Sequence, residues 1–261
     1  MRMAGAAALA CSSLASLALV PAGAGTSAAP PPIGLTAAPA RVLIEGSGNA
    51  AVRVSNYGAT AVVVDVARAG FSLDMRGRPR VLQRGDGRTA VGWIAMRPRK
   101  LVLRPRETRA VTVAATPSPR AEPGDHDALL LLTTRPRRRG SVAVRMRVGV
   151  VVVVRVPGKI VHRLELRALR LTRVAARART LELLVLNRGN VTEQLRPIHA
   201  SFERGGRVDR TSLPRPRQLR PHTRGILQLV YRGSLRGAVA VRVRVGLGAG
   251  GVVTRTFRLR L

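Results

Sequence analysis

The stretch VAVRMRVGVVVVVRV, residues 142–156, decides the fold class because its apolar side chains recur with a period of two. Every even-numbered position is Val or Met, while the odd positions include Arg145 and Arg147. Such alternation is typical of a β-strand with one face in a core. The longest apolar run after the N-terminal segment, residues 148–154, is much shorter than the ~20 residues of a membrane-spanning helix. The stretch therefore predicts a core strand of an all-β fold.

Shorter alternating segments follow one another along the rest of the chain, with Gly, Pro and Asn between them. Many short strands separated by turn residues are typical of β-sandwiches and small barrels. The predicted strands are 51–55, 61–67, 101–103, 109–115, 129–133, 142–156, 164–171, 181–186, 198–202, 226–231, 239–245 and 252–261.

Two short motifs occur twice, in the same order. Asn187 follows Asn56 by 131 residues, each at the end of an alternating segment and two residues before a Gly. Leu219-Arg220-Pro221 follows Leu103-Arg104-Pro105 by 116 residues. These offsets are close to the length of an immunoglobulin-like sandwich. We therefore expect two immunoglobulin-like β-sandwich domains in tandem, residues 30–157 and 160–261, joined at Pro157-Gly158.

The N-terminus has the composition of an export signal. An apolar stretch over residues 4–20 follows a basic start, and small residues lead to predicted cleavage after Ala28 or Ala29. The alternative, an uncleaved anchor helix, is marginal at this length. The only cysteine, Cys11, lies in this segment, which excludes disulfides and cysteine-zinc sites from the mature chain. We expect residues 1–29 to be a signal peptide and the mature protein, without a transmembrane helix, to be secreted or held in the cell envelope.

The charge balance points to anionic partners. The 261 residues include 46 Lys and Arg against 13 Asp and Glu, a formal net charge of +33, and only Lys100 and Lys159 are lysines. A GC-rich gene explains the preference for Arg, yet the field still attracts polyanions over about 8 Å, and guanidinium groups bind phosphate and carboxylate in bidentate fashion. The candidate polyanion-binding residues are Arg135, Arg137, Arg138, Arg139, Arg145, Arg147, Arg242 and Arg244.

Residues 142–156 offer a second kind of site. We favour the reading in which this segment is the last core strand of the first domain. In the alternative, its edge is exposed and pairs with a strand of a partner protein. The candidate edge residues are Val144, Met146, Val148, Val150 and Val152.

Catalysis, cofactors and metals find little support. The four histidines are dispersed and match no hydrolase or metalloprotease motif. Asp125-His126-Asp127 has ligand chemistry, but three adjacent residues cannot fill a coordination shell, and we interpret them as a solvated turn before a strand. We therefore predict no catalytic residue, no metal and no cofactor. Nucleic acid is disfavoured, because six scattered aromatic residues give no stacking platform and no recognition helix is predicted.

Five short motifs invite comparison with a known family. They are Trp93-Ile94, Leu101 to Pro105, Glu122 to His126, Arg155 to Gly158 and Asn187 to Asn190. In these motifs, residues 33–200 resemble the peptidoglycan-binding domain of WxL-protein-interacting bacterial surface proteins. The resemblance implies two immunoglobulin-like domains and a place in the bacterial envelope. The architecture more distantly resembles that of the periplasmic pilus chaperones.

The leading hypothesis is a non-catalytic, exported envelope protein that binds an anionic wall polymer, peptidoglycan or a surface protein. The alternative is an extracytoplasmic, chaperone-like protein that captures partner strands at an exposed edge. A cationic nucleic-acid binder is the third hypothesis, and the least favoured.

Overall fold

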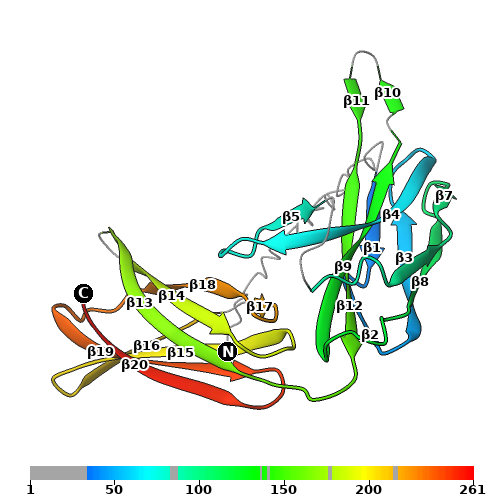
Figure 1. Cartoon of the computed structure of the whole chain (residues 1–261). Helices are drawn as coiled ribbons and strands as arrows, with labels where there is room; N and C mark the ends of the chain where they lie inside the picture. Colours follow the sequence, from blue (N-terminus) through cyan, green and yellow to red (C-terminus); the bar gives the residue numbers. More distant parts are fainter. Residues whose placement is uncertain (1–33, 83–87, 136, 140–141, 176–177, 214–216) are drawn as a thin grey trace, which may run out of the picture. The chain divides into compact units, whose positions relative to one another are not determined.

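The computed structural model describes residues 34–82, 88–135, 137–139, 142–175, 178–213 and 217–261, and strands make up most of them (Figure 1). The predicted signal peptide, residues 1–29 with Cys11, Ala28 and Ala29, lies outside the described residues. Within the described ranges, no helix has the length and apolar character needed to cross a membrane.

The first sandwich consists of two sheets and a hairpin (Figure 1). The first sheet, in the order β1-β3-β8-β6, comprises β1 (Leu35–Ala38), β3 (Gly48–Asn56), β8 (Thr108–Ala115) and β6 (Ile94–Arg97). The second, in the order β2-β12-β9-β4-β5, comprises β2 (Arg41–Glu45), β12 (Arg147–Val156), β9 (Gly124–Thr134), β4 (Val62–Leu73) and β5 (Pro79–Leu82), with β7 (Lys100–Leu103) on β4. The hairpin comprises β10 (Arg137–Arg139) and β11 (Val142–Val144).

The second sandwich has two sheets of its own. One, in the order β13-β14-β18, comprises β13 (Leu164–Ala175), β14 (Ala178–Asn187) and β18 (Arg224–Tyr231). The other, in the order β16-β15-β19-β20, comprises β16 (Arg207–Leu213), β15 (Glu193–Arg204), β19 (Ala238–Leu247) and β20 (Val252–Arg260), with β17 (Arg217–Leu219) on β15.

Alternating aliphatic residues fill two separate cores. The first includes Val150, Val152 and Val154 of β12, all completely buried, as the period of two predicts. The second includes Phe202 and Tyr231. No buried core residue belongs to both. The chain is thus an all-β protein of two immunoglobulin-like β-sandwiches in tandem. The domain limits 30–157 and 160–261 stay a prediction.

The two sandwiches repeat one connectivity. The order β4-β9-β12, with β7 on β4, has its counterpart in β15-β19-β20, with β17 on β15. Asn56 ends β3 and Asn187 ends β14. In both cases Nδ2 donates to the carbonyl four residues on and to the Leu and Arg carbonyls of the Leu-Arg-Pro motif, at 2.8–3.2 Å. Each Oδ1 accepts from the N–H two residues on. The repeated motifs therefore mark one turn used twice.

The predicted single strand over residues 142–156 is wrong in one respect, because it breaks between β11 and β12. At the break the N–H of Met146 donates to Oγ1 of Thr134 at 2.8 Å, so a side chain replaces one carbonyl of the β9–β12 ladder. Beyond it, β10 is the one partner of β11 among the described strands.

Candidate functional site

One half of β12 has a strand on each side, and the other half has only one. β9 pairs with β12 along its whole length, from Arg147 to Val156. β2 pairs with the opposite side only from Val151 to Arg155. Over residues 147–150 no described strand occupies that side. This segment is called the open edge below.

Hydrogen bonds to the β2 side show which backbone groups the open edge presents. The N–H of Val151 donates to Ala40, and the carbonyl of Arg155 accepts from Gly46. Odd-numbered residues of β12 therefore direct their N–H and C=O groups away from β9, because these groups alternate between sides in an antiparallel strand. Arg147 and Gly149 have the same parity. Their backbone groups are the ones left without a strand partner.

The predicted edge residues divide between core and surface. Val150 and Val152 are completely buried, and Met146 and Val148 pack partly against the same core. Val144, in β11, is 46% exposed. Val152 is not on the open edge, because β2 covers that side of it. What the open edge offers is therefore main chain, while its apolar side chains face the core.

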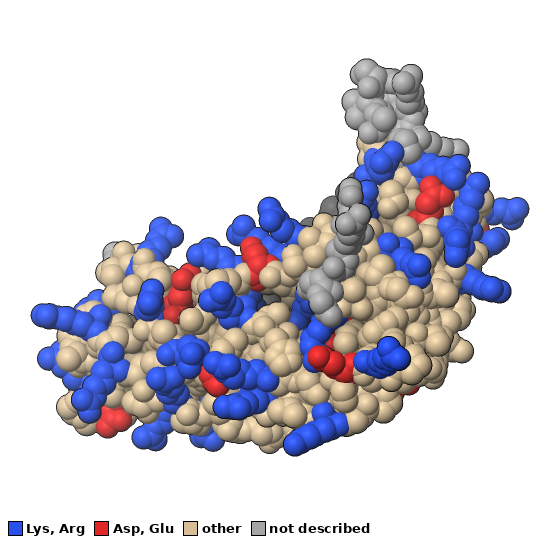
Figure 2. Space-filling view, in the orientation of Figure 1, with Lys and Arg blue, Asp and Glu red and all other residues tan. Residues whose placement is uncertain are grey.

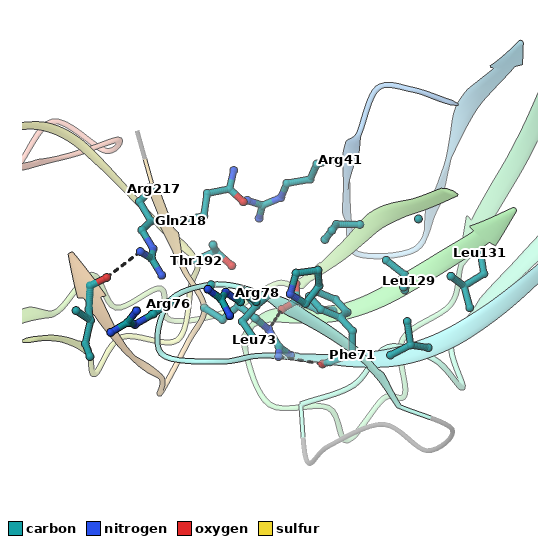
Figure 3. Close-up of a pocket in the computed structure, with 18 of the residues that line it drawn as sticks. Arg41, Phe71, Leu73, Arg76, Arg78, Leu129, Leu131, Thr192, Arg217 and Gln218 are labelled. Atoms are coloured by element: carbon teal, nitrogen blue, oxygen red, sulfur yellow. Dashed lines mark hydrogen bonds and ion pairs between the residues drawn. The ribbon is translucent and has the colours of Figure 1, made fainter. Parts of the chain in front are cut away.

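A cleft of about 1070 Å³ lies next to the open edge and is lined by both sandwiches (Figure 3). Leu129, Leu131 and Val151 form its floor, together with Phe71 and Leu73. These residues lie on the outer face of the β12-β9-β4 sheet and form an apolar cluster separate from the sandwich cores. An apolar floor of this kind provides area for burying a ligand's side chains.

Arginines surround the apolar floor. The lining includes Arg41, Arg76, Arg78, Arg147, Arg217 and Arg220. Arg41, the first residue of β2, is half-buried, and this burial lowers its pKa although Asp127 and Asp125 oppose the shift. Neither Arg41 nor Arg147 makes an ion pair with a described carboxylate. Both are therefore available as donors to an anionic group or a carbonyl in the cleft.

A buried ion pair joins the two sandwiches at the cleft. Nε of Arg220 donates to Asp127 at 2.5 Å, and Nη1 donates to the carbonyl of Phe71 at 3.1 Å. The guanidinium also lies 4.8 Å from the centre of the Phe71 ring. Burial raises the pKa of Asp127, and the charge of Arg220 opposes this.

A second polar contact involves the neighbouring carboxylate. Asp125 accepts two hydrogen bonds from Arg155, at 2.7 and 3.2 Å, and one from the N–H of Thr192 at 2.8 Å. Gly124 has φ +111°, and a Cβ there would come within 2.2 Å of the carbonyl oxygen of Asn190. Only glycine fits this approach.

The solvated turn predicted at Asp125-His126-Asp127 is therefore wrong. All three residues lie in β9 and are at most 5% exposed. The ring of His126 packs against Trp93 with 4.6 Å between centroids, and its Nε2 lies 2.9 Å from the carbonyl oxygen of Glu122. Among the described residues, no cluster of three or more His, Cys, Asp or Glu could hold a metal. Asp125, His126 and Asp127 are all buried, so no alternation of polar and apolar residues in the sequence marked them as part of a strand.

The eight candidate polyanion-binding arginines do not form one patch. Arg135 is paired with Asp65 at 3.0 Å. Arg145 and Arg147 are exposed near the start of β12, whereas Arg242 and Arg244 are exposed on β19 of the other sandwich. The backbone of Arg137, Arg138 and Arg139 forms β10, but their side chains lie outside what the structure describes. Figure 2 shows basic side chains over both sandwiches, with few acidic ones in this view.

No protein-family model and no curated protein matches this sequence. Solved structures with a similar fold include the following two. A chain of a chaperone–tip adhesin complex of CFA/I fimbriae is 10% identical, with 85% of this chain and 98% of that chain covered and a TM-score of 0.50. The class 5 fimbriae chaperone CfaA is also 10% identical, with 87% and 100% covered and a TM-score of 0.50. The likeness supports the resemblance to pilus chaperones and not that to WxL-interacting proteins. The chain therefore has a two-sandwich fold similar to that of a solved fimbriae chaperone.

Proposed function

We propose that this protein is a non-catalytic, extracytoplasmic chaperone-like protein that captures an extended segment of an exported partner at the open edge of β12. The observation that carries the proposal is the one-sided pairing of residues 147–150 beside an apolar cleft. Strand addition to such an edge is a recurring mode of peptide recognition. The proposal takes up the second hypothesis from the sequence.

The proposal implies a bound segment of a particular kind. Its backbone would bond to the N–H and C=O groups of Arg147 and Gly149. Alternate side chains would lie over the outer face of the sheet, next to Leu129 and Leu131. A segment that alternates apolar and polar residues fits this arrangement best, because only one of its faces meets the apolar floor.

The start of β2 sets where an added strand must stop. From Arg41 onward, β2 already occupies this side of β12. An incoming strand therefore ends at the half-buried guanidinium of Arg41, which makes no ion pair with a described carboxylate. A backbone carbonyl or a terminal carboxylate of the partner would accept hydrogen bonds there.

The shared fold is a further support. Among the solved structures of similar fold are a chain of a chaperone–tip adhesin complex and a fimbriae chaperone. By comparison, a wall-polymer function is less well supported, since the arginines that would serve it are divided between two sandwiches. The predicted export signal is compatible with either function.

A proline at an odd position of β12 tests the proposal directly. Gly149→Pro removes an N–H from the open edge and leaves the β9 ladder intact, because proline is tolerated where the N–H faces away from the sheet. We expect at least a tenfold loss of affinity for a fluorescent peptide of alternating Val and Ser residues, measured by anisotropy. Gly149→Ala keeps the N–H and is the matched control.

Arg147→Pro, compared with Arg147→Gln, separates the backbone from the charge. Arg147→Pro should lower the affinity for the peptide at least tenfold, as Gly149→Pro does. Arg147→Gln should not. If Gly149→Pro and Gly149→Ala bind the peptide equally well, and the affinity varies only with the salt concentration, then no strand adds to the open edge. Proline at Val148 or Val150 is unsuitable, because their N–H groups point toward β9.

A further inference from the structure

The outer face of the β16-β15-β19-β20 sheet carries arginines on three of its four strands. Ser201 of β15 lies between Arg210 of β16 and Arg242 of β19. Arg244 lies two residues further along β19, and Arg258 of β20 pairs with Ala240. The neighbours of Arg242, Arg244 and Arg258 along their strands pack in the core, and Arg210 shares its register position with Ser201 and Arg242, so the four arginines project from one side. The four side chains, Arg210, Arg242, Arg244 and Arg258, are called the arginine face.

The arginine face has no internal neutralisation in the described structure. All four residues are exposed, and none makes an ion pair with a described carboxylate. The residues between them are mostly hydroxyl donors, namely Ser201, Ser212, Thr254 and Thr256. One acidic residue, Glu203, lies on the same face. The face is therefore a sheet of donors with a net positive charge.

Two shallow depressions occur on this face, of about 350 and 300 Å³. Ser201 and Arg210 line both of them. Arg244 completes the first and Arg242 the second. A guanidinium beside a hydroxyl is a donor pair suited to phosphate oxygens. The first depression has no carboxylate in its lining, whereas Glu203 lines the second beside its two arginines.

The repeat shows that the fold does not require this chemistry. In the first sandwich the equivalent sheet, β4-β9-β12, has an outer face with Phe71, Leu129, Leu131 and Val151. The same face of the same sheet is thus apolar in one sandwich and cationic in the other. A general excess of Arg over Lys explains the residue type but not this difference in position.

We propose that the arginine face docks the protein on the surface of a bilayer that contains anionic phospholipids. Neighbouring strands are about 4.8 Å apart, and alternate residues on a strand about 6.7 Å, so the four charges lie within roughly 15 Å on a sheet surface. A planar array of phosphates can meet all four guanidinium groups at the same time. Each group then lies within the screening length, about 8 Å, of the phosphate that it faces. The face carries no aromatic residue for stacking nucleic-acid bases.

Vesicle sedimentation tests the proposal with the full chain. The probe is a set of vesicles of phosphatidylcholine with and without 30% phosphatidylglycerol, at several salt concentrations. Each Arg→Gln change on the arginine face should weaken binding to the anionic vesicles about fivefold. The variant with Arg210, Arg242, Arg244 and Arg258 all changed to Gln should bind more than 100-fold more weakly. Its thermal unfolding should match that of the parent.

The matched control removes the same charge from the first sandwich. Arg53, Arg97, Arg99 and Arg104 are exposed and make no ion pair with a described residue. Changing these four to Gln should cost less than fivefold. Equal losses from both quadruple variants would overturn the proposal in favour of diffuse attraction. It would also be overturned if a soluble polyphosphate bound in the same way while vesicles were not retained. Peptide capture at the open edge should be unchanged in both variants.

Discussion

At the scale of single residues, Asn56 and Asn187 each hold a turn with four hydrogen bonds. Asn187→Ala leaves buried carbonyls and one N–H without their side-chain partner. We expect the free energy of unfolding of the second sandwich to fall by about 3 kcal/mol, measured by urea denaturation. Asn49→Ala, at an exposed position, is the control and should change stability by less than about 0.5 kcal/mol.

Tyr231 predicts a dependence of stability on alkaline pH. Its buried hydroxyl donates to Asp209 at 2.5 Å and accepts from the N–H of Leu235. Burial and the bond to Asp209 raise the pKa of Tyr231. Its contribution to stability is therefore complete below pH 10 and is lost as the pH rises through the raised pKa. Urea unfolding at pH 9 and pH 11 should show a decrease that Tyr231→Phe abolishes, whereas Tyr57→Phe, at an exposed tyrosine, leaves the decrease in place.

At the scale of elements, alternation located most of the sheets correctly. Each of the twelve predicted strands overlaps an observed one, because aliphatic residues at every second position have only one way to reach a core. The strands that were missed include β1, β5 and β17, with three or four residues each. Segments that short do not complete enough periods to stand out from loops.

The open edge was harder to foresee than the strand that carries it. The break before β12 depends on Thr134, whose side chain takes the place of a carbonyl. The length of the open edge depends on β2, which joins in parallel from the far end of the domain. Neither partner is encoded in residues 142–156 themselves. The alternation there predicted which side chains enter the core, but not which backbone groups stay unpaired.

At the scale of the whole molecule, the repeat predicted two sandwiches but not the contacts between them. Asp127 and Arg220 are 93 residues apart, and Asp125 and Thr192 are 67 apart. Pairing over such distances leaves no periodic signal. The same Asp-His-Asp run therefore suggested a solvated turn, although in the folded chain it is buried beside the other sandwich.

Arg220 and Arg104 occupy equivalent places in the two repeats, which gives a matched experiment. Arg220→Met leaves Asp127 buried without its cation and should cost about 3 kcal/mol or more in urea unfolding at pH 7. Since burial already raises the pKa of Asp127, stability of this variant should fall as the pH rises through that pKa. Asp127→Asn in the same chain should restore part of the loss. Arg104→Met, at an exposed position, should be nearly neutral; an equal effect at both positions would contradict the assigned role of the pair.

In β12, even-numbered residues fill the core and odd-numbered residues of the open edge present unpaired backbone groups. This division affects which partner proteins the edge can bind. The side chains that enter the core and the backbone groups of the open edge belong to different residues. Substitutions at the exposed odd positions, other than to proline, therefore leave the backbone donors and acceptors of the edge in place. Hydrogen bonds between main chains do not depend on the side chains of the bound segment. Selectivity must then come from the neighbouring cleft, and one unchanged edge would serve a series of unrelated clients, each sorted by what it places over Leu129 and Leu131.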